Sequence, residues 1–238
     1  PAQSDYFQAC KGGGHGDYHL LVYAPASVQE MVDMMANAFD TAEKYRMPAM
    51  IMGDGSLGQM MEPVSFENCK PAHQAEKAWA TDGTGMKRKR NIINSIYIEP
   101  QDLERLVRER FERYRQVEEN ETKWEEIGTE DADLVLVAYG ITSRIAKTAM
   151  KQARAKGYKV GMIRPITLWP FPTAPLKKAA DTAKDFLVVE MSMGQMIEDV
   201  KLATECKKPV HFYGRTGGMG PTPAAVLEEI EKIMGGAK

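Results

Sequence analysis

An aspartate flanked by two glycines, Gly53-Asp54-Gly55, directly follows a short apolar run that begins at Ala49. A buried parallel strand presents an acidic side chain in this way at its carboxyl end, the edge of an α/β sheet where ligands bind. A carboxylate at this place can hold a metal ion, line a cleft, or cap the loop that follows. Asp54 is therefore the first candidate for a functional residue.

The Gly-Asp-Gly triplet invites comparison with the signature of thiamine diphosphate enzymes, in which the aspartate holds the magnesium ion that neutralises the diphosphate. That motif needs an asparagine further along the same domain to complete the oxygen shell of the metal. No asparagine lies between Asn68 and Asn91, and the intervening segment lacks the pattern of a helix. The sequence predicts that Asp54 does not bind magnesium, and it leaves open whether Asp54 lines a cleft or only caps the loop.

Two glycine-rich segments are further candidates for binding. Residues 12–17 surround His15 with glycines, which let the backbone approach a ligand or partner closely, although a connecting loop is the plainer interpretation. In residues 214–222, glycines and Arg215 at the start of a predicted helix could hold a phosphate or carboxylate. That segment matches neither the dinucleotide fingerprint nor the P-loop, so whether the turn at 214–218 binds an anion stays open.

Composition narrows the class of protein. The chain has 238 residues, 43% hydrophobic and 27% charged, which suffices for one large or two modest α/β domains. Its net charge of -2 gives no electrostatic reason to expect a nucleic acid or a membrane as partner. No apolar run is long enough to span a bilayer and no signal-like segment is present, so we expect a soluble, cytoplasmic protein. The three cysteines form no CxxC pair, which places any redox metal on another chain.

The spacing of apolar residues predicts the elements that would position Asp54. A strand at 20–24, a helix capped by Ser27 and Glu30 that ends near Tyr45, and a strand at 50–52 form a parallel crossover unit. Residues 65–93, with the basic run Lys87-Arg88-Lys89-Arg90, are typical of an extended arm. A strongly charged helix follows at 103–114.

The second half repeats the α/β rhythm. Four strands alternate with helices, and one helix is predicted to be capped by Thr142 and closed by Gly157. This pattern predicts an open, mostly parallel sheet covered by helices on both faces. The expected strands are 134–139, 159–163, 186–189 and 210–213, with further helices at 194–204 and from Thr222-Pro223 onward.

Six groups of residues, in the same order, resemble the α subunit of 2-oxoacid:ferredoxin oxidoreductases, most closely the branched-chain (2-ketoisovalerate) type. They extend over nearly the whole chain. They are residues 3–5 with 13–17, then 24–30, 42–48, 53–63, 164–172 and 189–195.

The resemblance implies an α/β fold made of a partial pyrimidine-type thiamine diphosphate domain (1–64), a connecting arm and charged helix (65–130), and a transketolase C-terminal-like domain (131–238). In this family a 2-oxoacid is oxidatively decarboxylated to acyl-CoA with ferredoxin as electron acceptor. Thiamine diphosphate and magnesium are shared with a partner β subunit, and the iron–sulfur clusters lie on other chains. We therefore expect no cofactor bound to this chain alone.

The resemblance also implies which residues lie near the chemistry. Gln3, Asp5, His15 and Asp54 are expected beside the cofactor or substrate, and Glu190 and Gln195 at a subunit interface. No metal ligand is predicted. By this comparison the catalytic carboxylate lies upstream of Pro1, so the catalytic residues are unknown, the chain is expected to be a C-terminal fragment, and alone it is expected to be inactive.

The expected partners are the β subunit, a ferredoxin-like subunit and a γ subunit, with ferredoxin reached indirectly. A homodimer, the identity of the 2-oxoacid and the sequence before Pro1 stay open. Two alternatives also stay open: a non-catalytic assembly module of such a complex, and a transketolase-type or oxoacid dehydrogenase β chain.

Overall fold

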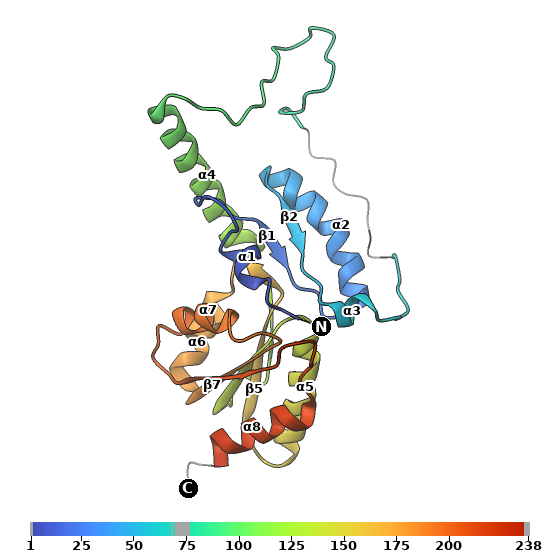
Figure 1. The fold of residues 1–238 in the computed structure, drawn as a ribbon, viewed down its shortest axis with the longest axis vertical. Helices are drawn as coiled ribbons and strands as arrows, with labels where there is room; N and C mark the ends of the chain where they lie inside the picture. Colours follow the sequence, from blue (N-terminus) through green and yellow to red (C-terminus); the bar gives the residue numbers. More distant parts are fainter. Residues whose placement is uncertain (1, 68, 70–76, 236–238) are drawn as a thin grey trace.

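The computed structural model of the chain describes residues 2–67, 69 and 77–235. Its strands form two sheets, which lie in the upper and lower parts of Figure 1. The first has three strands in the order β2-β1-β6, and the second has five in the order β3-β5-β4-β7-β8. The α/β class predicted from the sequence is confirmed.

The N-terminal unit is the predicted crossover. Strands β1 and β2 pair in parallel, with Leu21 opposite Ala49, and the helix between them packs on both. The Ser27 side chain accepts a hydrogen bond from the Glu30 backbone N–H, as predicted, while the Glu30 carboxylate accepts from the backbone N–H of Ala26. The elements are α1 (Tyr6–Cys10), β1 (Leu21–Tyr23), α2 (Val28–Tyr45), β2 (Ala49–Ile51) and α3 (Gly55–Gly58).

A long connection, here called the arm (residues 59–99), leaves the body after α3 and returns at the start of α4 (Pro100–Glu121) (Figure 1). Its described residues form no helix or strand, which agrees with the extended segment predicted there. The following helix is strongly charged and buries a stripe that includes Tyr114 and Val117.

The five-stranded sheet is parallel except for its first edge strand, β3, which runs antiparallel to β5. Alternate residues of the central strand β4 enter two different hydrophobic clusters, Leu134 and Leu136 facing α5 and α8, Val135 and Val137 facing α6 and α7. Helices therefore cover both faces, as predicted. The elements are β3 (Trp124–Ile127), β4 (Leu134–Val137), α5 (Gly140–Ala155), β5 (Val160–Pro165), β6 (Thr167–Trp169), α6 (Thr173–Thr182), β7 (Asp185–Glu190), α7 (Met196–Ala203), β8 (Val210–Gly214) and α8 (Pro223–Gly235).

The sequence missed three elements of this half. Strand β3 lies in the polar stretch expected to be a linker, and α6 and β6 were not predicted. The prediction that Thr142 caps α5 is wrong: the helix begins at Gly140, and the Thr142 hydroxyl donates to the backbone carbonyl of Tyr139 at 2.6 Å.

Strand β6 connects the two halves. It follows β5 after a single residue, yet it pairs with β1 in the N-terminal sheet, with Trp169 opposite Val22. The first sheet is therefore built from both halves of the sequence. Among the described residues, no helix combines the length and apolar composition needed to cross a lipid bilayer.

Candidate functional site

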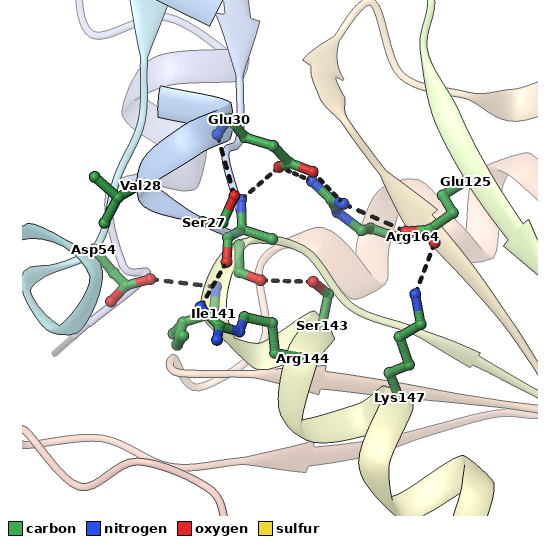
Figure 2. A network of polar contacts seen from close by, with 12 residues as sticks. Ser27, Val28, Glu30, Asp54, Glu125, Ile141, Ser143, Arg144, Lys147 and Arg164 are labelled. Atoms are coloured by element: carbon green, nitrogen blue, oxygen red, sulfur yellow. Dashed lines mark hydrogen bonds and ion pairs between the residues drawn. The ribbon is translucent and has the colours of Figure 1, made fainter. Parts of the chain in front are cut away.

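Asp54 lies at the carboxyl end of β2, where its side chain joins three segments. One carboxylate oxygen accepts hydrogen bonds from the backbone N–H groups of Ser56 and Leu57, at 2.9 and 3.0 Å, and so caps α3. The other oxygen accepts a longer bond of 3.4 Å from the N–H of Ile141, at the start of α5. Figure 2 shows this contact between the two halves of the chain. The capping role considered from the sequence is therefore present.

Gln3 is buried against the carboxyl ends of β4 and β7. Its amide nitrogen donates to the carbonyl of Tyr139 at 3.1 Å, and its amide oxygen accepts from the N–H of Met191 at 2.9 Å. Its own backbone N–H donates to the carbonyl of Met191, and its carbonyl accepts from the Tyr139 hydroxyl. With these groups engaged, Gln3 fixes the N-terminal segment across the edge of the second sheet.

Gly140 allows Gln3 and Asp54 to come close together. Its φ of +56° is in the left-handed region, which disfavours residues with a side chain. A Cβ atom at this position would lie 3.2 Å from the Gln3 amide nitrogen and 3.6 Å from an Asp54 oxygen. The glycine therefore makes room for the two polar side chains.

A small cavity of about 20 Å³ lies where these residues meet. The structure thus brings Gln3, Asp5 and Asp54, three of the four residues expected beside the cofactor or substrate, around one space. A cavity needs about 10–15 Å³ to hold a water molecule, whereas small-molecule sites have about 300–1,000 Å³. The cavity fits one water and not a thiamine ring. Its lining is Ala2, Gln3, Asp5, Met52, Gly53, Asp54, Tyr139 and Gly140.

Magnesium and a diphosphate do not fit at Asp54 in this arrangement. Its two oxygens accept backbone N–H groups, which would have to give way to a cation that requires oxygen ligands. The described residues also contain no group of three His, Cys, Asp or Glu side chains arranged to hold a metal ion. We therefore assign no metal or cofactor step to the Asp54 site.

Glu190 ends β7 with its side chain fully buried. Its carboxylate accepts hydrogen bonds from the backbone N–H groups of Gln195, Met196 and Ile197 and from the Ser192 hydroxyl, at 3.0 to 3.3 Å. The three backbone donors lie at the start of α7, where a negative charge is favourable. The carboxylate itself lies inside the chain. A subunit interface at this end of β7 therefore stays a prediction, and it does not involve the carboxylate.

Gln195 connects α7 to the N-terminal segment. Its amide oxygen accepts from the backbone N–H of Phe7 at 2.8 Å, and its amide nitrogen donates to the carbonyl of Ser4 at 2.8 Å. The Tyr6 hydroxyl adds a bond of 2.5 Å to Asp199. Burial, and then the charge of Asp199, raises the pKa of Tyr6 well above its usual value, so this phenol stays a hydrogen-bond donor at neutral pH.

His15 lies elsewhere. It is exposed in the glycine-rich loop after α1, where Gly13 and Gly14 donate to the Tyr18 hydroxyl, and it does not line the small cavity. In the second glycine-rich segment, Gly217 and Gly218 both have positive φ, and the N–H of Met219 donates to the carbonyl of Thr216. That geometry belongs to a tight turn.

An ionic network around the buried Arg164, which the sequence did not predict, joins the two halves (Figure 2). Arg164 of β5 is 6% exposed and pairs with Glu30 of α2 through both terminal nitrogens, and with Glu125 of β3 at 3.3 Å. Lys147 of α5 completes the network, with its Nζ 2.9 Å from a carboxylate oxygen of Glu125. One signal was available: an arginine within an otherwise apolar strand requires buried partners.

Two family models match the chain. The model of the pyruvate flavodoxin/ferredoxin oxidoreductase thiamine diphosphate-binding domain matches residues 1–126, and that of pyruvate:ferredoxin oxidoreductase core domain II matches residues 132–226. The fold resembles a 2-oxoglutarate:ferredoxin oxidoreductase from Magnetococcus marinus, with a TM-score of 0.73 and 24% identity over 97% of this chain and 45% of that one.

Curated relatives agree with the family models. Ketoisovalerate oxidoreductase subunits VorB from Methanothermobacter marburgensis and Methanothermobacter thermautotrophicus are 46% and 44% identical over 99% of this chain. The 2-oxoglutarate synthase subunit KorA from Methanocaldococcus jannaschii is 33% identical, with 98% of this chain and 68% of the relative covered. The chain spans 66% of the length of the two VorB subunits.

The fold and these matches define the class first: an α/β chain with the domains of an oxidoreductase family. The chain belongs to the 2-oxoacid:ferredoxin oxidoreductase family. The family inferred from the six groups of residues is thereby confirmed.

Proposed function

We propose that this chain is part of a subunit of an enzyme complex that oxidatively decarboxylates branched-chain 2-oxoacids, 2-ketoisovalerate above all, to acyl-CoA with ferredoxin as electron acceptor. One observation supports this substrate class. Identity to the two ketoisovalerate oxidoreductase subunits is 46% and 44%, against 29% to 33% for 2-oxoglutarate synthase subunits matched over nearly the whole chain.

We further propose that thiamine diphosphate and magnesium are shared with a partner β subunit and that the iron–sulfur clusters lie on other chains. A ferredoxin-like subunit and a γ subunit are further proposed partners. The hydrogen bonds to Asp54 and the small cavity beside it support this division of labour. In this proposal the chain forms one wall of the active site. Gln3, Asp5 and Asp54 shape that wall, and His15 approaches the partner from the exposed loop.

The proposed division of the chain is residues 1–64, 65–130 and 131–238. The family models support a boundary near 130, since one match ends at 126 and the next begins at 132. Strand β6 belongs by sequence to the last part and by pairing to the first sheet.

The alternative of a non-catalytic assembly module keeps support from the contacts of three side chains. Gln3, Glu190 and Gln195 all fix segments of the chain rather than face open solvent.

The test is an assay of the subunit co-expressed with its β and ferredoxin-like partners. We expect CoA-dependent reduction of a low-potential viologen dye with 2-ketoisovalerate, and kcat/KM at least tenfold higher than with 2-oxoglutarate or pyruvate. Preference for 2-oxoglutarate would contradict the substrate class. An assembled complex that reduces the dye with none of the three acids would favour the assembly-module alternative.

A further inference from the structure

A hollow of about 430 Å³ lies between α4, the end of α2 and the last part of the arm, and it shares no lining residue with the cavity at Asp54. Its volume falls in the range of about 300–1,000 Å³ that is typical of small-molecule sites. Its lining is mainly polar and basic: Arg46, Asn94, Ser95, Tyr97, Leu103, Leu106, Glu109, Arg110 and Arg113.

Three arginines converge on this hollow from two elements. Arg110 and Arg113 are three residues apart on α4 and so share one face of the helix. Arg46 ends α2 with a φ of 49°, in the left-handed conformation that glycine or asparagine usually adopts there. Its guanidinium lies over the ring of Trp79, 5.1 Å from the ring centre, which orients it from the arm.

The charges of these three arginines are not neutralised by any carboxylate among the described residues. Elsewhere on α4, by contrast, Arg108 pairs with Glu104 and Arg115 with Glu112. Glu109, the one acidic residue in the lining, is engaged by Arg105 at 2.8 Å. The hollow therefore has a local excess of positive charge on a chain whose net charge is -2.

The donors of these arginines are also left available. Arg110 uses one terminal nitrogen to donate to the carbonyl of Asp17 at 2.9 Å. The Nε of Arg113 is enclosed and has no acceptor among the described residues. Because that nitrogen is closed to solvent, an anion in the hollow would be bound through the terminal nitrogens of the arginines that line it.

We propose that this hollow binds a small anion with phosphoryl groups, and that Arg110 and Arg113 are its principal ligands, with Arg46 as a third. Guanidinium groups match phosphate oxygens in a fork of two hydrogen bonds, and several such groups favour a diphosphate over a single carboxylate. Ser95 and Tyr97, whose hydroxyls are neutral donors, also line the hollow. The proposal is independent of the function assigned to the Asp54 site.

The test is isothermal titration calorimetry of the chain with inorganic pyrophosphate at low salt. We expect saturable binding that the double variant Arg110→Ala/Arg113→Ala weakens at least tenfold. The matched control is Arg108→Ala/Arg115→Ala, which removes the same charge from the same helix at positions paired outside the hollow. It should bind within twofold of the parent.

Equal weakening by the two double variants would overturn the proposal, because it would trace binding to net charge alone. Absence of saturable binding would overturn it too, as would binding confined to an acidic peptide such as oligoglutamate, which would make the hollow a protein interface. If the alanine variant loses its circular dichroism spectrum, Arg110→Lys/Arg113→Lys keeps the charge without the fork and should still weaken binding. ADP is titrated in parallel: tighter binding than pyrophosphate identifies a nucleotide as the source of the diphosphate, and weaker binding identifies the free anion.

Discussion

Two buried side chains, Gln3 and Glu190, bind backbone groups of other segments. Each has its hydrogen-bonding atoms occupied within the chain. A side chain held in this way defines where a segment lies, and it is poorly placed to exchange protons with a substrate. At the scale of single residues, these two side chains therefore act by positioning other segments of the chain.

Replacement of Glu190 by glutamine tests that role. Each carboxylate oxygen of Glu190 accepts hydrogen bonds from at least two N–H or hydroxyl donors. In the variant, the NH₂ group of the glutamine would replace one of these oxygens and would face donors where an acceptor is needed. We expect Glu190→Gln to lower the free energy of unfolding by about 2 kcal/mol. Urea denaturation followed by circular dichroism measures it. Glu198→Gln, an exposed change in the first turn of α7, is the control. Equal stabilities for the two variants would disprove the positioning role of Glu190.

The cysteines give a second prediction. Burial, and then the charge of Asp199, raises the pKa of Cys10 to about 12, whereas Cys206 is exposed. At pH 8 the thiolate fraction of Cys10 is then about 10⁻⁴, and only thiolates react with iodoacetamide. Mass spectrometry of the native chain should find Cys206 alkylated well before Cys10, with the difference abolished in urea. Early labelling of Cys10 in the folded chain would contradict its placement.

How far the sequence predicts these residues depends on where their partners lie. A local pattern, a strand that ends in Gly-Asp-Gly, was enough to predict a carboxylate at the strand end that either lines a cleft or caps the loop, and the cap is present. The contacts of Gln3 join residues 136 and 188 positions away, and no local pattern encodes them. His15 became a candidate through the glycine-rich loop and the family resemblance. The structure places it in an exposed loop, and its role stays a prediction.

Among the elements, α2, β3, β5 and α5 are joined by the network of Glu30, Arg164, Glu125 and Lys147. Burial tends to raise the pKa of Glu125, but the hydrogen bond and charge of Lys147, together with Arg164, outweigh it and hold that pKa below the usual value. A carboxylate with a depressed pKa in the folded state stabilises the fold above its unfolded pKa of about 4.3. That contribution is lost as the pH falls through the folded-state pKa.

The expected consequence is acid sensitivity that depends on Glu125. Between about pH 5 and pH 3 the melting temperature of the parent should fall more steeply than that of Glu125→Gln, since the variant has no proton to gain at this site. Melting curves at closely spaced pH values measure it. Glu119→Gln, an exposed change on α4, should follow the parent. Parallel curves for the parent and Glu125→Gln would show that the network does not link stability to pH.

The elements themselves were predictable where periodicity is strong. The crossover β1-α2-β2 and the strands β4, β5, β7 and β8 follow from apolar runs and caps. Strand β3 escaped because two of its four residues, Glu125 and Glu126, are charged, as an exposed edge strand permits. Strand β6 escaped because three residues between prolines offer no period to detect.

For the whole molecule, the contacts between its halves predict the outcome of a cut in the arm. Trypsin should cleave at the exposed basic run of residues 87–90. The fragments should still elute together from a size-exclusion column, because β6 pairs with β1, Arg164 with Glu30, and Gln3 with Tyr139. In 6 M urea, about the strength that unfolds small domains, they should separate. Separate elution without denaturant would contradict the contacts between the halves.

The placement of β6 also constrains the order of events during synthesis. Because β1 lies between β2 and β6, the central strand of the first sheet lacks one neighbour until residue 169 has left the ribosome. At about 5–20 residues per second, the roughly 120 residues between β2 and β6 leave that strand edge unpaired for about 6–24 seconds. Unpaired strand edges are sites of aggregation. The nascent chain is therefore expected to need chaperone protection over this interval, although its first strands are complete early.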